Sequence, residues 1–383
     1  MILILSLLDD LHATAVAWGT RKLGVPCSIL DMASLPSSES VGLKLDSAGG
    51  IGVSMRGHEI SEDMSFDSSS VSAVWSRRLN LGLFNTRGVH ELDRHHVTVE
   101  CRATVSNIHA ALCASGMKFV NDHVAGLAAQ SKLYQLVVAR NSGLRVPRTV
   151  IGNDPDMVGE FYRTSGGRTL MKPFFQPGWM EGDKEFIQHA NVLDDGLVAM
   201  KDSIRLCPAI YQDYVEKAFE LRAVVMGSDI LFIKIDSQAR RESSVDWRGD
   251  LLGRSKLSVF HDVPDSIRDA LLGFMRRMNL DFGCIDLIVT GQGDYFFLEV
   301  NDQGQFLWIE ERNPDIGILD MFCRYLASFH APVSDDLPAL TLADYLGSEQ
   351  YVVDKESAQK RWDLSIGPAS KQGPVDSVER AIA

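Results

Sequence analysis

The sequence predicts an α/β fold that begins with a largely parallel sheet and ends with antiparallel strands. Over residues 1–120, short apolar runs alternate with longer segments of helical periodicity, which is typical of a parallel sheet flanked by helices. From Phe219 onward, strand-like runs follow one another directly, which is typical of antiparallel hairpins. At roughly 100 to 200 residues per domain, a chain of 383 residues predicts two or three core-forming units.

The predicted elements of the first part follow from these patterns. An apolar run at the start, helical periodicity that ends near Gly24, and glycines between short apolar runs each mark one element. The elements are a strand over 1–8, a helix over 10–23, a strand over 27–31, a hairpin around 49–52, a strand over 72–76, a helix over 88–115 and a strand over 118–120.

The remaining elements are predicted in the same way. They are a helix over 124–142, a strand after Pro147, a helix over 154–164, a strand over 168–172, a loop over 173–182, a helix near 193–202, strands over 209–214, 219–226 and 230–236, a polar segment over 237–256, a helix over 264–279, a hairpin of 282–289 with 295–300, and a helix over 315–329. We therefore expect segments 1–120, 121–215 and 216–330, followed by an appended or partly disordered extension over 331–383.

Composition excludes several classes of protein. The 38 basic and 51 acidic residues give a net charge of −13, which argues against binding to nucleic acid or acidic lipid. No apolar run reaches the roughly 20 residues that a membrane span needs, and the N-terminal run has no basic region before it. Six scattered cysteines without a Cys-x-x-Cys pair predict a cytoplasmic protein without disulfides.

The hairpin of residues 282–301 carries the strongest chemical pattern. If Gln292 and Gly293 form its turn, Asp286 lies directly opposite Glu299, and Asn301 projects from the same face. Two facing carboxylates repel each other, and a bound Mg²⁺ would remove that repulsion, because this ion prefers carboxylate and amide oxygens. A three-residue loop would make the pair diagonal, and an exposed polar face is the alternative interpretation.

Further polar residues fit a phosphate-bearing ligand. Lys172 ends a strand and precedes a loop with prolines and glycines, and Lys132 lies early in a helix, although either lysine alone is typical of a solvated surface. The connection around Asp213 can present backbone groups to a purine edge. Glu220 is placed to accept hydrogen bonds from ribose hydroxyls, and Arg222 lies two positions further along the same strand face.

Together these segments resemble the ATP-grasp superfamily over roughly residues 120–330. The order is a lysine on a helix, a lysine on a strand, a hinge at 213–215, then Glu220 and the set Asp286, Glu299 and Asn301. A closer resemblance is to the microviridin-type (graspetide) peptide ligases. It rests on the segments Val74-Trp-Ser-Arg-Arg78, Asp236-Ser-Gln238, Asp246-Trp-Arg248 and 297–310. Asp302 and Phe306 depart from that family, which usually has Pro and Trp there.

The resemblance implies an ATP-grasp fold with a Rossmann-like N-terminal domain, a central α+β domain and a C-terminal antiparallel sheet. It implies that ATP and Mg²⁺ are used to activate side-chain carboxylates of a leader-bearing precursor peptide, which are then joined to Ser/Thr hydroxyls or Lys amines. The implied roles are nucleotide binding for Lys132, Lys172, Asp213, Val215 and Glu220, metal binding for Asp286, Glu299 and Asn301, and catalysis for Arg222 and Arg248.

Two alternatives remain open. A ligase that acts on free amino acids or a protein C-terminus, similar to the glutamate-adding ligases, would share every nucleotide and metal residue. A nucleotide-binding regulatory protein without turnover would have less need for all three metal ligands. The resembled family also implies a homodimer.

Overall fold

The computed structural model describes residues 1–37, 39–47, 50–57, 63–78, 84–174, 178–181, 184–187, 190–239 and 255–366. The chain divides into two compact units. The first holds Met1–Gly126, Leu280–Phe282 and Gln303–Ala383, and the second holds Leu127–Asn279 and Gly283–Asp302. Because each unit draws on several stretches of the chain, the predicted boundaries at residues 120, 215 and 330 remain predictions. None of the described helices is long and apolar enough to cross a membrane.

The first unit contains the predicted parallel sheet. Its strands run in the order β2 (Cys27–Leu30), β1 (Ile2–Leu5), β6 (Ala73–Ser76) and β7 (Lys118–Val120), and every neighbouring pair is parallel. Helices α1 (Leu11–Lys22) and α2 (Arg94–Ala114) lie between these strands in the sequence. All four residues of β1 are buried, which agrees with a continuous apolar run in a sheet covered on both faces.

The hairpin predicted around residues 49–52 is part of a second sheet in the same unit. Strands β3 (Glu39–Leu45), β4 (Ile51–Gly57) and β5 (Met64–Asp67) pair in antiparallel fashion in that order. Alternate residues of β4 are buried and join the core cluster to which Ile108 and Leu112 of α2 also belong. The period-2 pattern of β4 is therefore a true strand signal with one face against the core.

The C-terminal segment packs against this unit as far as it is described. Helices α9 (Leu307–Arg312), α10 (Ile318–Ser328), α11 (Leu342–Leu346) and α12 (Glu349–Ile366) follow the last strand. Tyr345 is fully buried and contacts Trp18 of α1, and Arg361 of α12 forms ion pairs with Asp9 and Asp31. Part of the segment predicted as an appendage thus contributes to the core of the first unit, through Leu342 and Tyr345.

Close packing of α1 on α10 makes Gly19 a sensitive position. A Cβ atom there would lie 2.5 Å from Sγ of Cys323, which is fully buried. We expect Gly19→Ala to lower the free energy of unfolding by up to about 2 kcal/mol, because an overpacking cost of about 1–3 kcal/mol outweighs the helix-propensity gain of roughly 1 kcal/mol. Urea titration measures this change.

Two variants test the cause of that change. In Gly159→Ala on α5 (Pro155–Thr164), the new Cβ meets only Val198 at 4.0 Å, so unfolding free energy should stay equal or rise. The double variant Gly19→Ala/Cys323→Ala removes the clashing sulfur and should recover stability relative to Gly19→Ala alone. No recovery would show that the Sγ contact is not the source of the loss.

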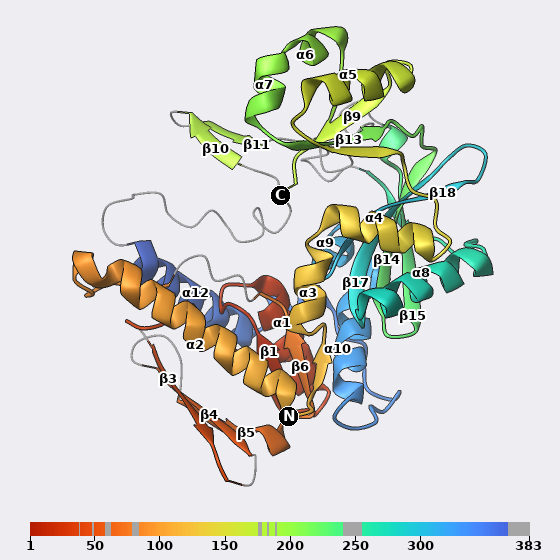
Figure 1. Ribbon diagram of the computed structural model, residues 1–383. Coiled ribbons are helices and arrows are strands. Elements are labelled where there is room, and N and C mark those ends of the chain that lie inside the picture. The colour runs from red at the N-terminus through yellow and green to blue at the C-terminus, as the bar shows by residue number, and fades with distance from the viewer. Residues whose placement is uncertain are drawn as a thin grey trace. The chain divides into compact units, whose positions relative to one another are not determined.

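The second unit contains two larger sheets and a two-stranded sheet (Figure 1). The first has the order β12 (Asn191–Val192), β9 (Thr169–Lys172), β13 (Ala209–Asp213) and β8 (Thr149–Gly152), and its helices are α5, α6 (Asp195–Ala199) and α7 (Lys201–Leu206). The second has the order β16 (Leu257–Val259), β15 (Asp229–Ile235), β14 (Phe219–Met226), β17 (Phe282–Val289) and β18 (Tyr295–Asn301), with α4 (Lys132–Asn141) and α8 (Asp265–Met278) packed together.

Three predicted elements between residues 123 and 206 differ from the structure. The helix predicted over 124–142 is two helices, α3 (His123–Ala129) and α4, because the Ser131 side chain accepts the N–H of Tyr134 and caps a new helix. Within the loop predicted over 173–182, β10 (Gly178–Glu181) pairs with β11 (Lys184–Ile187). The helix predicted near 193–202 is the pair α6 and α7, separated by Met200.

Candidate functional site

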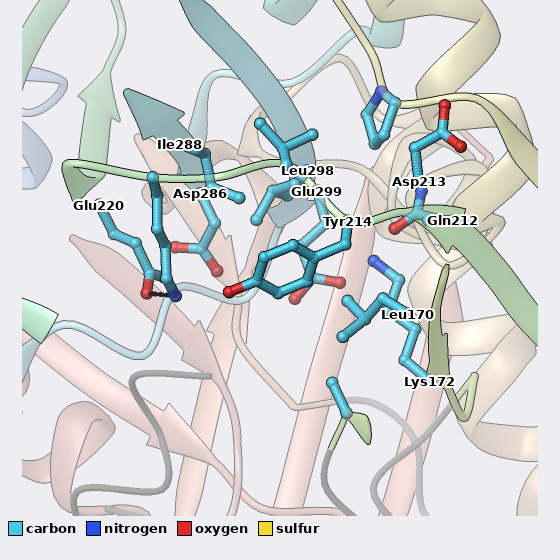
Figure 2. A pocket seen from close by; sticks show the side chains of 14 residues that line it. Leu170, Lys172, Gln212, Asp213, Tyr214, Glu220, Asp286, Ile288, Leu298 and Glu299 are labelled. Carbon is cyan, nitrogen blue, oxygen red and sulfur yellow. Dashed lines mark hydrogen bonds and ion pairs between the residues drawn. The ribbon is translucent and has the colours of Figure 1, made fainter. Parts of the chain in front are cut away.

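A pocket lies in the second unit, lined by residues of its four-stranded and its five-stranded sheet (Figure 2). The lining residues are Pro147, Leu170, Lys172, Ala190, Gln212, Asp213, Tyr214, Val215, Lys217, Glu220, Asp286, Ile288, Leu298 and Glu299. Six residues that the sequence singled out are among them: Lys172, Asp213, Val215, Glu220, Asp286 and Glu299.

The hairpin of β17 and β18 brings the two carboxylates together. Asp286 lies directly opposite Glu299, as predicted, although the turn of Gln292 and Gly293 on which that prediction depended is not formed. Thr290 pairs with Asp294, so the loop has three residues, and a bulge between the pairs 286/299 and 287/297 leaves Leu298 unpaired. The extra loop residue and the extra strand residue compensate for each other, which restores the predicted register.

The bulge also changes which side chains face the pocket. In a regular strand, Leu298 and Glu299 would point to opposite faces, yet both line the pocket. An apolar side chain therefore lies beside a metal-ligand candidate on the same wall. Alternation along the sequence concealed Leu298, and a bulge of this kind leaves no clear sequence signal.

The donor set at the hairpin fits Mg²⁺. Asn301 lies opposite Cys284, two residues from Glu299, so its amide is on the same strand face as both carboxylates. Within the described ranges, no three His, Cys, Asp or Glu side chains form a metal site of their own. Two carboxylates and one amide suit an ion that completes its coordination with substrate phosphates and water.

Each of the facing carboxylates is also paired with a cationic side chain. The guanidinium of Arg222 donates to Asp286 at 2.8 Å, and the ammonium of Lys132 donates to Glu299 at 2.7 Å. Burial alone would lower the pKa of Arg222, but the Asp286 carboxylate holds that pKa above its usual value. Because these cations offset the repulsion across the strands, the metal assignment rests on the donor set and the pocket rather than on repulsion.

Asp213 lies at the pocket, but its carboxylate serves the hinge. It accepts hydrogen bonds from Arg148 at 2.6 and 2.9 Å and from the Ser165 hydroxyl at 2.7 Å. In Figure 2 this carboxylate points away from the side chain of Tyr214. Partial burial tends to raise the pKa of Asp213, but the bonds from Arg148 and Ser165 lower it.

The hinge backbone offers a donor to a ligand. The N–H of Tyr214 donates to the carbonyl of Arg168 at 2.9 Å. The N–H of Val215, in contrast, donates to no group in the part of the chain that the structure describes. A backbone donor on the pocket wall suits an acceptor nitrogen of a purine, and the use of Val215 for the nucleotide stays a prediction.

Glu220 and Lys172 occupy different walls of the pocket. Glu220 is buried on β14 and accepts hydrogen bonds from Ser237 at 3.0 Å and from Lys217. Lys172 is the last residue of β9, as predicted, and its strand pairs with Ile210 of β13. Arg248, the second predicted catalytic arginine, lies outside the described residues.

Sequence reasoning missed two charged residues in or beside this site. Arg148 fixes the hinge through Asp213, and Lys217 pairs with Glu220 inside the pocket. Both are long cationic side chains in connecting segments, where a solvated surface residue is the ordinary expectation. A spacing of three residues indicates an ion pair on a helix, where such side chains are neighbours. Lys217 and Glu220 are not on a helix, so their spacing was only a weak signal of their contact.

Solved structures of ATP-grasp ligases are similar to this chain over most of its length. A Chryseobacterium gregarium RiPP-associated ATP-grasp ligase, solved with ADP and a leader and core peptide, has a TM-score of 0.75 at 23% identity, and the match covers 88% of this chain and 99% of that one. Macrocyclase MdnC from Microcystis aeruginosa MRC, solved with precursor peptide MdnA, has a TM-score of 0.72 at 26% identity over 86% of this chain and 99% of its own.

Sequence comparison gives a more distant relationship. A probable alpha-L-glutamate ligase of Enterobacter sp. (strain 638) is 24% identical over 191 residues, which are 48% of this chain. The match spans 58% of that relative's length. No protein-family model matches the sequence. The chain therefore has the ATP-grasp ligase fold predicted from its motifs and is related to ATP-grasp peptide ligases.

Proposed function

We propose that this protein is an ATP-dependent ligase that cross-links side chains of a ribosomally made precursor peptide. The observation that carries the proposal is the pocket in which Asp286 faces Glu299, with Arg222, Lys132 and Lys172 nearby. The likeness to a precursor-bound macrocyclase over 86% of the chain supports a peptide as the substrate. The implied homodimer stays a prediction.

The residues in and beside the pocket have distinct proposed roles. Val215 would read the purine through its backbone N–H, Glu220 would accept from ribose hydroxyls, and Lys172 would bind phosphate. Asp286, Glu299 and Asn301 would hold Mg²⁺, which supplies charge neutralisation at the phosphates when bound. Lys132 would exchange Glu299 for a phosphate oxygen. The hinge clamp of Asp213 and Arg148 would keep Val215 in place.

The proposed reaction has two steps. A side-chain carboxylate oxygen of the peptide attacks the γ-phosphorus of ATP, the bond to the β-phosphate oxygen breaks, and ADP leaves. A Ser/Thr hydroxyl or Lys amine then attacks the acyl carbon, loses its proton, and phosphate leaves. Arg222 and Arg248 are the proposed donors to the oxygens that gain charge, where each donor contributes roughly 3 kcal/mol.

Mass spectrometry tests the proposal directly. The enzyme is incubated with ATP, Mg²⁺ and a leader-bearing peptide rich in Thr, Ser, Asp and Glu from a neighbouring reading frame. We expect the peptide to lose about 18 Da per cross-link with stoichiometric ADP formation. Omission of ATP is the control.

A glutamate-ligase-like activity is the second candidate, favoured by the partial sequence match to the probable alpha-L-glutamate ligases. That activity would add the mass of an amino acid to the acceptor and would require the free amino acid. Mass gain in place of water loss would therefore replace the first proposal with the second.

A further inference from the structure

Lys217 is an unusual lysine for its place in the chain. It lies in the connection between β13 and β14, where the side chain of its neighbour Glu216 is 74% exposed. The Lys217 side chain is only 3% exposed and lines the pocket. Lysines are rarely buried to this degree unless they are paired. We therefore expect the Lys217 ammonium to have an anionic partner inside the pocket.

That interaction is with Glu220. The Lys217 ammonium donates to Oε1 of Glu220, and the hydroxyl of the fully buried Ser237 donates to the same oxygen at 3.0 Å. Two donors from different elements thus fix the carboxylate in one orientation. Neither donor was among the residues assigned to the site from the sequence.

The ion pair of Lys217 and Glu220 is one of several along the pocket wall. Four acidic residues line the pocket, and each has a cation: Arg148 on Asp213, Arg222 on Asp286, Lys132 on Glu299 and Lys217 on Glu220. Unpaired carboxylates would repel a polyanionic nucleotide, and a buried one would favour its protonated form. Lys217 therefore neutralises the charge of Glu220 and orients its carboxylate as a hydrogen-bond acceptor.

We infer that Lys217 is a positioning residue that makes Glu220 select ribonucleotides through the ribose hydroxyls. The inference rests on the proposed nucleotide site. A carboxylate that accepts from a hydroxyl rejects the analogue that lacks it, since the charged acceptor is then left without that bond. Lys217 acts through Glu220 and does not itself need to contact the nucleotide.

Calorimetric titration of the full chain with ATP, 2′-deoxy-ATP and 3′-deoxy-ATP, each with Mg²⁺, tests this inference. We expect the wild type to prefer ATP over at least one deoxy analogue by about 10-fold or more. In Lys217→Met and in Glu220→Gln, that preference should fall below about 3-fold. Lys217→Arg should retain most of it, because the guanidinium can replace the ion pair.

The controls separate positioning from a general structural effect. Lys201→Met removes an exposed lysine that pairs with Asp156 outside the pocket, so the preference should not change. If Lys217 only stabilised the fold, Lys217→Met would weaken all three nucleotides equally and leave the ratio intact, which would overturn the inference. The double variant Lys217→Met/Glu220→Gln should show no further loss of preference than Glu220→Gln alone.

Failure of the inference is distinguishable from failure of the proposed function. If the wild type binds no ATP, the nucleotide site is wrong, and both fall together. If the wild type binds and prefers ATP but Lys217→Met keeps the full preference, only the role of Lys217 is overturned. If Glu220→Gln keeps the preference, Glu220 does not face the ribose, and the inference also falls while ATP binding stands.

Discussion

Replacement of Glu299 by glutamine is expected to lower the rate of ATP-dependent product formation by about 10³-fold, because the amide removes one of two negative charges from the proposed metal site. Glutamine has the same shape and keeps an acceptor oxygen for the Lys132 ammonium, which Glu299 accepts at 2.7 Å. Both side chains are partly exposed, so the fold should tolerate the change. ADP release under saturating ATP measures the effect.

Two further measurements make this prediction specific. Glu216→Gln removes a carboxylate that pairs with Arg168 at the surface, and it should leave the rate within about 2-fold of wild type. The concentration of Mg²⁺ that gives half-maximal rate should rise in Glu299→Gln and stay constant in the control. Wild-type activity and an unchanged Mg²⁺ requirement in Glu299→Gln would remove this residue from the metal site.

The sequence predicted the central contact of the site through an incomplete argument. Strand alternation placed Asp286 opposite Glu299 on the assumption of a two-residue turn, whereas the loop has three residues. The pairing survives because the bulge at Leu298 shifts the register back. The alternation of side chains indicates which residues share a strand face. It does not encode the backbone geometry that sets the loop length and the compensating bulge.

The sequence also could not predict which charged residues pair with each other. Arg148 and Asp213 are 65 positions apart, and so are bound through tertiary structure rather than through local spacing. Arg361 likewise reaches Asp31 from the far end of the chain, which is why the segment after residue 330 was predicted as an appendage. Helix α8 was predicted over 264–279 and lies at Asp265–Met278, because its helical periodicity is a local signal. The first strand, predicted over 1–8 from an apolar run, is only Ile2–Leu5.

Removal of Arg222 should be costly for stability as well as for activity. Arg222 and Asp286 are both largely buried, and the ion pair joins adjacent strands β14 and β17. Arg222→Met leaves the Asp286 carboxylate without its buried cation, and losing one partner of a buried pair costs about 3–5 kcal/mol. We expect the free energy of unfolding to fall by that amount in a urea titration.

The size of this loss should depend on the charge that remains at Asp286, because the penalty arises from the unpaired carboxylate rather than from the lost contact. Arg222→Met/Asp286→Leu, which removes both charges, should therefore be more stable than Arg222→Met by at least 1 kcal/mol. Arg168→Met, which breaks an exposed pair with Glu216, should change stability by less than about 1 kcal/mol. Equal destabilisation in the single and double variants would mean that Arg222 stabilises the sheet through its packing, and that the charge of Asp286 is satisfied by other groups. Activity should be lost in both variants, since each removes a residue of the proposed site, so stability and turnover report on separate roles of the same ion pair.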